Sequence, residues 1–188
     1  MRSATVTTVA TVDERTPRGK LARSIFDTDN LTALVAGHAG VGWLVNELRE
    51  RSVRPPSDFE RQSLLLHPDT KNVLVRRGVT RTGIETAARA LVMVSFAAVV
   101  ARNRFPDDVR EALENGSIGL GEALRPYGMR RHTTTVRFVD EIDKVGGRQV
   151  LRVNATLSLP GIGPVALVDE VLYASALRRS STRSVSRP

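Results

Sequence analysis

Cysteine is absent from the 188-residue sequence, and histidine and aromatic residues are scarce. Without cysteine the chain has no disulfide framework, no thiolate zinc site and no cysteine nucleophile. The three histidines, His38, His67 and His132, lie far apart and show no HExxH or HxH spacing. We therefore expect no metal site.

A long uninterrupted apolar run is also missing. The longest apolar stretch, residues 87–101, is broken by Arg89 and Ser95 and is shorter than the ~20 residues that a membrane-spanning helix needs. The first residues, MRSATVTTVATVDERT, contain no continuous apolar segment of the kind found in export signals. These features predict a cytoplasmic protein with no membrane partner.

The middle of the chain lacks an excess of either charge, although the formal net charge is +8. Residues 178–188 carry four Arg and no acid, residues 1–23 carry a net +3, and residues 24–177 keep only +1. With aromatic residues at 4%, we expect no nucleic-acid partner, and weak attraction of the tails to polyanions is the alternative. We predict a flexible N-terminal segment (1–23), one domain (24–177) and a disordered basic tail (178–188).

The first half of the chain shows helical and strand patterns in turn. Apolar residues at helical spacing predict helices over 30–36 and 43–51, the second ending at Pro55-Pro56. Residues 71–81 read as a strand followed by a turn at Thr82-Gly83. Residues 86–101 fit a buried strand, a helix, or one followed by the other.

The second half has clearer boundaries. A helix is expected from Pro106 to Asn115-Gly116, because Asp107 and Asp108 suit the positive end of its dipole, and a short helix follows over 120–126. Three strands joined by glycine-containing turns are expected over 133–140, 149–159 and 164–174. The predicted fold class is therefore α+β, with helices packed on a mostly antiparallel sheet.

Two adjacent acids lie in the last predicted strand, PVALVDEVLY. Strand alternation puts Asp169 on one face and Glu170 on the other, and both faces are otherwise apolar. The strand is therefore predicted to be central and covered on both sides. A carboxylate withdrawn from water either finds a cation or holds a proton, so a structural ion pair and a functional acid both stay open.

Arginines that could meet such an acid lie on other predicted strands. Arg76 shares a strand face with Leu74 and Gly78, and Arg77 takes the opposite face. A guanidinium held on a strand can bind a carboxylate ligand through two hydrogen bonds; a surface arginine is the alternative. Arg130-Arg131-His132 is either a solvated edge or the rim of an anionic site. The segment Gly116–Gly121 contains GxxGxG without a phosphate-loop lysine, which favours a turn into a helix.

Several stretches, in the same order, resemble the chorismate lyase (chorismate–pyruvate lyase) family, whose superfamily includes ligand-binding domains of bacterial transcription regulators. They are GHAGVGWLVNEL, VLVRRGVTRTG, FPDDVREALENGSIGLGEALRPYG and LRVNATLSLPGIGPVALVDEVLYASAL, which together cover most of residues 30–177. The resemblance implies a helix-flanked antiparallel sheet around an internal ligand pocket. It also implies cofactor-free elimination of pyruvate from chorismate, giving 4-hydroxybenzoate or a related hydroxybenzoate.

The resemblance also implies roles for individual residues. Glu170 matches the family's acid and would donate a proton to the departing enolpyruvyl oxygen, while Arg76 matches the arginine that binds a substrate carboxylate. The positions matched to substrate binding are Arg89 on the returning strand, Leu120 and Gly121 in the turn, and Val41 near the N-terminus.

The sequence departs from the family pattern in three places. The stretch between Arg89 and Pro106 is longer than usual, so Arg102 is the alternative to Arg89 as the second substrate-binding arginine. The turn lacks the usual proline, and Gly42 stands where a small hydroxyl residue is common. Two alternatives to the lyase therefore stay open: a natural-product enzyme of the same fold, such as a cyclase, and a binding module for small aromatic ligands. A regulator sensor normally follows a DNA-binding domain, for which residues 1–29 are too short. The oligomeric state is not predicted.

Overall fold

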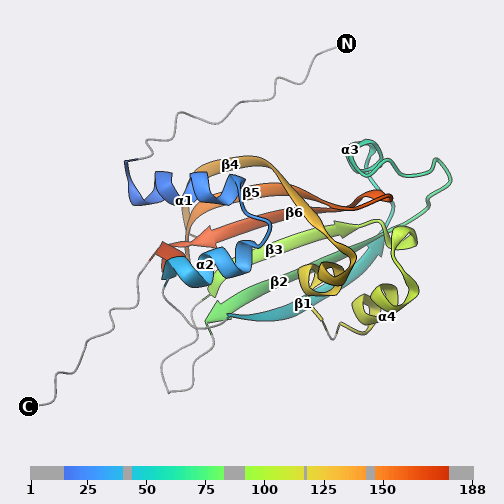
Figure 1. Ribbon diagram of the computed structural model, residues 1–188, viewed down its shortest axis with the longest axis horizontal. Coiled ribbons are helices and arrows are strands. Elements are labelled where there is room, and N and C mark those ends of the chain that lie inside the picture. The colour runs from blue at the N-terminus through green and yellow to red at the C-terminus, as the bar shows by residue number, and fades with distance from the viewer. Residues whose placement is uncertain (1–14, 40–43, 83–91, 117, 143–146, 178–188) are drawn as a thin grey trace, which may run out of the picture.

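The computed structural model describes residues 15–39, 44–82, 92–116, 118–142 and 147–177. Its centre is an open six-stranded sheet in the order β1-β2-β3-β6-β5-β4, in which every neighbouring pair is antiparallel (Figure 1). The strands are β1 (Leu44–Arg54), β2 (Val73–Thr82), β3 (Val92–Val100), β4 (Arg130–Ile142), β5 (Arg148–Leu159) and β6 (Gly163–Tyr173). This arrangement is the α+β class predicted from the sequence.

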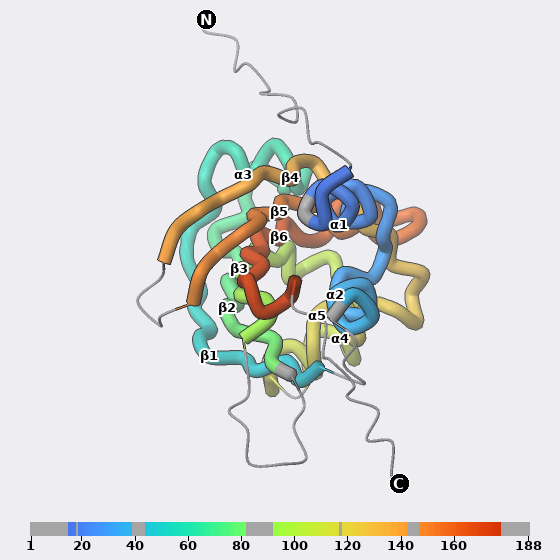
Figure 2. Tube along the Cα trace, turned by 90° about the vertical axis from the view of Figure 1, so that its left-hand side faces the viewer, coloured from blue at the N-terminus to red at the C-terminus, as the bar shows by residue number. Residues whose placement is uncertain are grey.

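Four helices lie on one side of this sheet, in two groups (Figure 2). The first group is α1 (Pro17–Phe26) and α2 (Leu31–Ala39), and the second is α4 (Asp107–Asn115) and α5 (Leu120–Leu124). A further short helix, α3 (Asp58–Ser63), follows β1. We call the helix-covered side of the sheet the inner face and the opposite side the outer face.

Each helix group buries its own apolar cluster against the inner face. Leu21 and Ile25 of α1 and Val35 of α2 pack with residues of β3, β4, β5 and β6. Leu113 of α4 and Leu124 of α5 pack with β2, β3, β5 and β6 nearer the other end of the sheet. The inner face therefore carries two cores side by side rather than one continuous core.

The strands and helices of the second half are confirmed. The three C-terminal strands, the helix from Asp107 and the short helix from Leu120 all form where the sequence patterns place them. Helix α4 ends at Gly116, whose φ of 68° is the left-handed conformation that favours glycine after a helix. The ambiguous run at 86–101 contains strand β3, and its first residues lie outside the described ranges.

The helix predicted over 43–51 is wrong, because residues 44–54 form edge strand β1. Its charged residues meet arginines of β2: Glu47 pairs with Arg81, and Glu50 pairs with Arg77. Cross-strand pairs of opposite charge stabilise a strand, and local helical spacing cannot reveal a partner about 30 residues away in the sequence. The predicted stop at Pro55-Pro56 agrees with the end of β1.

Packed structure also begins earlier than the domain boundary drawn at residue 24. Helix α1 starts at Pro17, Thr16 caps it by accepting a hydrogen bond from the Gly19 amide, and Leu21 is buried. The two termini of the chain, 1–14 and 178–188, are outside the described ranges. Within those ranges, none of the helices has the length and apolar character needed to cross a membrane.

Helix α3 was not predicted, although its start carries a sequence signature. Ser57 and Glu60 form a capping box: the Glu60 amide donates to Ser57 Oγ at 3.2 Å, and the Ser57 amide donates to Glu60 Oε2 at 2.8 Å. Arg54 then donates to both Glu60 oxygens, at 2.6 and 2.7 Å. The pKa of Glu60 lies below its ordinary value of 4.5, mainly because Arg54 donates these hydrogen bonds to the carboxylate.

This ion pair predicts a pH dependence of stability. Because the folded pKa of Glu60 is depressed, its stabilisation is complete above pH 4.5 and is lost as the pH falls through the folded pKa. We expect Glu60→Gln to lower the free energy of unfolding by about 1–2 kcal/mol at pH 7. On acidification, the free energy of unfolding of this variant should fall less than that of the wild type. Unfolding in urea between pH 3 and 7 measures both. Glu111→Gln, at an exposed position of α4, is the control and should leave the pH profile unchanged.

Candidate functional site

A row of aromatic and polar side chains crosses the inner face between the two cores. On β6, Leu172 belongs to the α1–α2 core and Val168 to the α4–α5 core, and Glu170 lies between them. Glu170 pairs directly with Phe96 of β3, and Phe96 pairs directly with Gly78 of β2. Paired residues of neighbouring strands share a face, so these residues form one line across the sheet.

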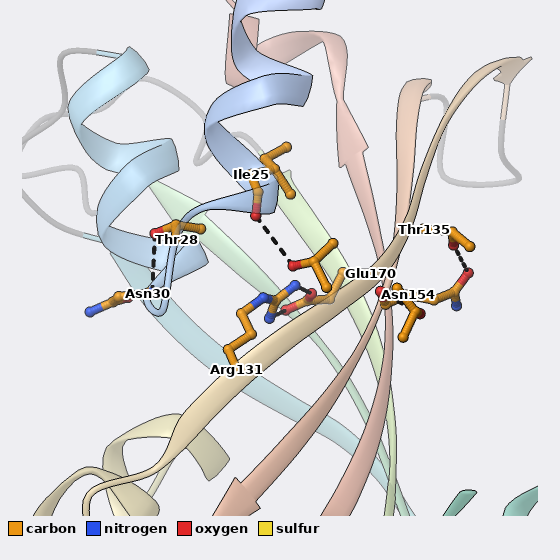
Figure 3. A network of polar contacts seen from close by, with 9 residues as sticks. Ile25, Thr28, Asn30, Arg131, Thr135, Asn154 and Glu170 are labelled. Atoms are coloured by element: carbon orange, nitrogen blue, oxygen red, sulfur yellow. Dashed lines mark hydrogen bonds and ion pairs between the residues drawn. The ribbon is translucent and has the colours of Figure 1, made fainter. Parts of the chain in front are cut away.

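Glu170 finds its cation on β4. Arg131 donates to both carboxylate oxygens, with Nη2 at 2.5 Å and Nη1 at 3.3 Å (Figure 3). The two side chains are only 5% and 14% exposed, so this is a buried ion pair of the bidentate type. Of the two possibilities that the sequence leaves open for Glu170, the structure shows an ion-pair partner, and the functional role of the acid stays a prediction.

The same part of β4 is tied to helix α1. Thr133 Oγ1 donates to the Ile25 carbonyl at 3.2 Å, and Thr133 lies two residues beyond Arg131 on β4. The Arg131 Nε atom is buried and has no hydrogen-bond partner among the described residues. One donor of this guanidinium is therefore left over after the contact with Glu170.

Asp169 lies on the other side of the sheet, as strand alternation predicted. It forms a two-point ion pair with Arg152 of β5, and the side chains of the pair are 30% and 40% exposed. Strand β6 is central in the sheet, and on its outer face Val165 and Tyr173 are buried, whereas Leu167, Asp169 and Val171 between them are half-buried. The adjacent acids thus have different environments, and only Glu170 faces the helices.

Arg76 shares the inner face with Glu170. The strand register links Arg76 to Ala98 and Ala98 to Val168, which is two positions from Glu170 on β6. Arg76 is 3% exposed. Its Nη2 donates to the Ile118 carbonyl at 3.1 Å, and its Nε is buried without a hydrogen-bond partner in the described part of the chain.

Among the described residues, Arg76 forms no ion pair. Burial, and to a lesser degree the nearby charge of Arg51, lower the pKa of Arg76 from its ordinary value. Arg77, its neighbour in sequence, is exposed on the outer face and pairs with Glu50. A buried guanidinium with a free donor is suited to bind an acidic group that enters from outside the protein.

Phe96 and Gly78 are parts of this row that the sequence reasoning missed. A Cβ atom on Gly78 would lie 2.6 Å from Phe96 Cζ, so the aromatic ring occupies the space that a side chain at position 78 would take. Phe96 is half-buried and belongs to neither core. A glycine inside a strand is the available signal, because it often marks a close approach of another group to the backbone.

The turn predicted over Gly116–Gly121 contacts Arg76. The Ile118 carbonyl accepts from Arg76, and a Cβ on Gly119 would lie 3.0 Å from the side-chain amide of Asn46 on β1. Leu120 begins α5 and packs against the α4–α5 core, whereas Gly121 is exposed. The structure therefore brings Arg76 to the residues just before Leu120.

The other predicted binding residues are not part of this row as described. Val41 and Arg89 lie outside the described residues. Arg102, the rival of Arg89, is exposed and forms an ion pair with Glu114 of α4. The arginine that the structure does bring to Glu170 is Arg131, whose basic cluster the sequence offered as the possible rim of an anionic site.

A surface hollow of about 570 Å³ lies elsewhere on the molecule and includes neither Arg76 nor Glu170. Its lining residues come from the loop before β2, the turn after β3 and helix α4; they are His67, Asp69, Thr70, Lys71, Asn72, Arg102, Asn103 and Arg110. The internal ligand pocket stays a prediction. In the described part of the chain no group of three or more His, Asp or Glu residues is arranged to hold a metal ion.

An open antiparallel sheet with helix groups on one face is consistent with the chorismate lyase-like fold. No protein-family model and no curated protein matches the sequence. Solved structures do match. The effector domain of PhnF from Mycobacterium smegmatis has a TM-score of 0.54 at 11% identity, covering 78% of this chain and 89% of that one.

Two further solved structures are similar in fold at low sequence identity. The ligand-binding domain described as belonging to a GntR-family transcriptional regulator from Bordetella bronchiseptica has a TM-score of 0.52 at 14% identity, covering 70% of this chain and 83% of that one. A gene product of Staphylococcus aureus has a TM-score of 0.54 at 11% identity, covering 82% and 94%. These likenesses establish a shared fold, which regulator ligand-binding domains use, and they do not confirm membership of the chorismate lyase family.

Proposed function

We propose that this chain is a small-molecule-binding domain whose ligand carries an acidic group bound by Arg76. The observation that carries the proposal is a buried guanidinium beside the Phe96–Glu170 row. Within the described ranges it donates to one carbonyl, and its Nε donor is unused. An uncompensated buried charge is unfavourable, and an anionic ligand removes that penalty. The solved structures described as a ligand-binding domain and an effector domain support the same function.

The contacts of Glu170 favour binding over catalysis. Both of its oxygens accept hydrogen bonds from Arg131, so the side chain balances an arginine rather than offering a proton to a leaving group. A lyase acting on chorismate remains the prediction that comes from the sequence resemblance. Incubation with chorismate distinguishes the two functions, because a lyase releases pyruvate and a binding domain does not.

Replacing Arg76 tests the anion site. We expect Arg76→Gln to weaken the binding of 4-hydroxybenzoate or chorismate about 10- to 100-fold, because a hydrogen bond to a charged group contributes ~1.5–3 kcal/mol. Isothermal titration calorimetry measures the dissociation constants, and circular dichroism confirms that the variant is folded.

Arg77→Gln is the matched control, since Arg77 lies next in the sequence and is exposed on the outer face. It should change the affinity by less than about twofold, because a rim or surface charge contributes little. Equal affinities for wild type and Arg76→Gln would contradict the proposed anchor.

A further inference from the structure

We propose that Phe96 is the residue that makes the Arg76 site select flat, aromatic ligands over saturated ones. This inference rests on the proposed function, and it names both the ligand class and the side chain that sets it. The ligand is an aromatic carboxylate, whose acid group contacts Arg76 and whose ring lies against Phe96.

The first support is the position of the Phe96 ring. It extends from β3 across to β2, where its Cζ and Cε1 atoms lie 2.6 and 2.9 Å from the point where Gly78 would carry a Cβ. Gly78 is two residues from Arg76 on the same strand and the same face, a separation of ~7 Å along a strand. The ring therefore lies over the strand position two residues from Arg76 on the same face of β2.

The second support is that the ring belongs to no core cluster of the described residues. Phe96 is half-buried, and it belongs to neither the α1–α2 core nor the α4–α5 core. The inner-face residues before and after it on β3 differ in this respect, since Val94 joins the first core and Ala98 joins the second. A large aromatic side chain normally buries most of its surface, so this ring has apolar surface left for a ligand.

The third support is the polarity around the ring. Glu170 is the direct partner of Phe96 on β6, and Arg131 neutralises it by donating to both oxygens. The ring is thus bordered by Arg76 on one side and by a neutralised ion pair on the other. A second anionic group on the ligand is not required, which matches a ring that carries one carboxylate.

Comparison of two acids of similar size tests the inference. Benzoate and cyclohexanecarboxylate carry the same charge, and a pair of aromatic rings attracts more strongly than its buried area alone accounts for. We expect the wild type to bind benzoate about three- to tenfold more tightly. In Phe96→Leu and in Phe96→Met the ratio of the two dissociation constants should fall to about one, with the affinity for cyclohexanecarboxylate nearly unchanged.

Phe59→Leu is the control, because Phe59 lies on α3 and is 70% exposed; it should keep the wild-type ratio. The use of two Phe96 variants guards against one of them failing to fold, which thermal unfolding detects. If Arg76→Gln abolishes benzoate binding while the Phe96 variants keep the wild-type preference, the role of Phe96 is refuted and the anion site stands. If the wild type binds neither acid, both proposals are refuted.

Discussion

Replacing Arg131 by methionine should lower the free energy of unfolding by about 3–5 kcal/mol, the range measured when one partner of a buried ion pair is removed. The reason is that Glu170, 14% exposed, would be left on the inner face without the guanidinium that now contacts both of its oxygens. Denaturation in urea at pH 7 measures the effect.

Two further variants test whether the loss of stability depends on the burial of the ion pair. Arg131→Met combined with Glu170→Leu replaces the pair by apolar side chains and should recover the stability to within about 1 kcal/mol of the wild type. Arg152→Met removes the partner of Asp169 on the outer face, where both side chains are about a third exposed, and should lower stability by less than about 1 kcal/mol. Equal losses for Arg131→Met and Arg152→Met would show that the inner row is open to water.

Gly78→Ala should be the most disruptive single-methyl change in the sheet, at about 3 kcal/mol. Its Cβ would lie 2.1 Å from the Glu47 carbonyl oxygen of β1 and 2.6 Å from Phe96 Cζ. Since the first neighbour is backbone, the pairing of β1 with β2 has to shift. Chemical denaturation measures the loss.

The contrasting substitution is Gly37→Ala in helix α2. A Cβ at Gly37 meets no atom within 4 Å, and alanine favours a helix over glycine by ~0.5–1 kcal/mol. We expect this variant to be more stable than the wild type. A similar loss from both alanine substitutions would contradict the close approach at Gly78.

The parts of the fold that local patterns specify were predictable. The C-terminal strands show alternation with a period of two, and helix α4 has acids at its start and Gly116 after its end. Alternation also placed Asp169 and Glu170 on opposite faces, and Arg76 and Arg77 likewise. These inferences succeed because the face of a strand residue depends only on its own position in the strand.

The errors and omissions share a different cause. Strand β1 was predicted as a helix because its partners on β2, Arg77 and Arg81, are distant in the sequence. Phe96 was overlooked because its significance depends on Gly78, a residue of another strand. The partner of Glu170 was left open among several arginines for the same reason.

The sequence by itself therefore determined the α+β class, most of the elements, and the faces on which Asp169, Glu170, Arg76 and Arg77 lie. Only the tertiary structure decided that Arg131 contacts both oxygens of Glu170 and that Phe96 covers Gly78 between two separate cores. It also decided that Arg76 Nε has no hydrogen-bond partner among the residues that the structure describes. The physical reason is that strand periodicity is a property of neighbouring residues, whereas ion pairing and ring packing depend on which strands lie side by side.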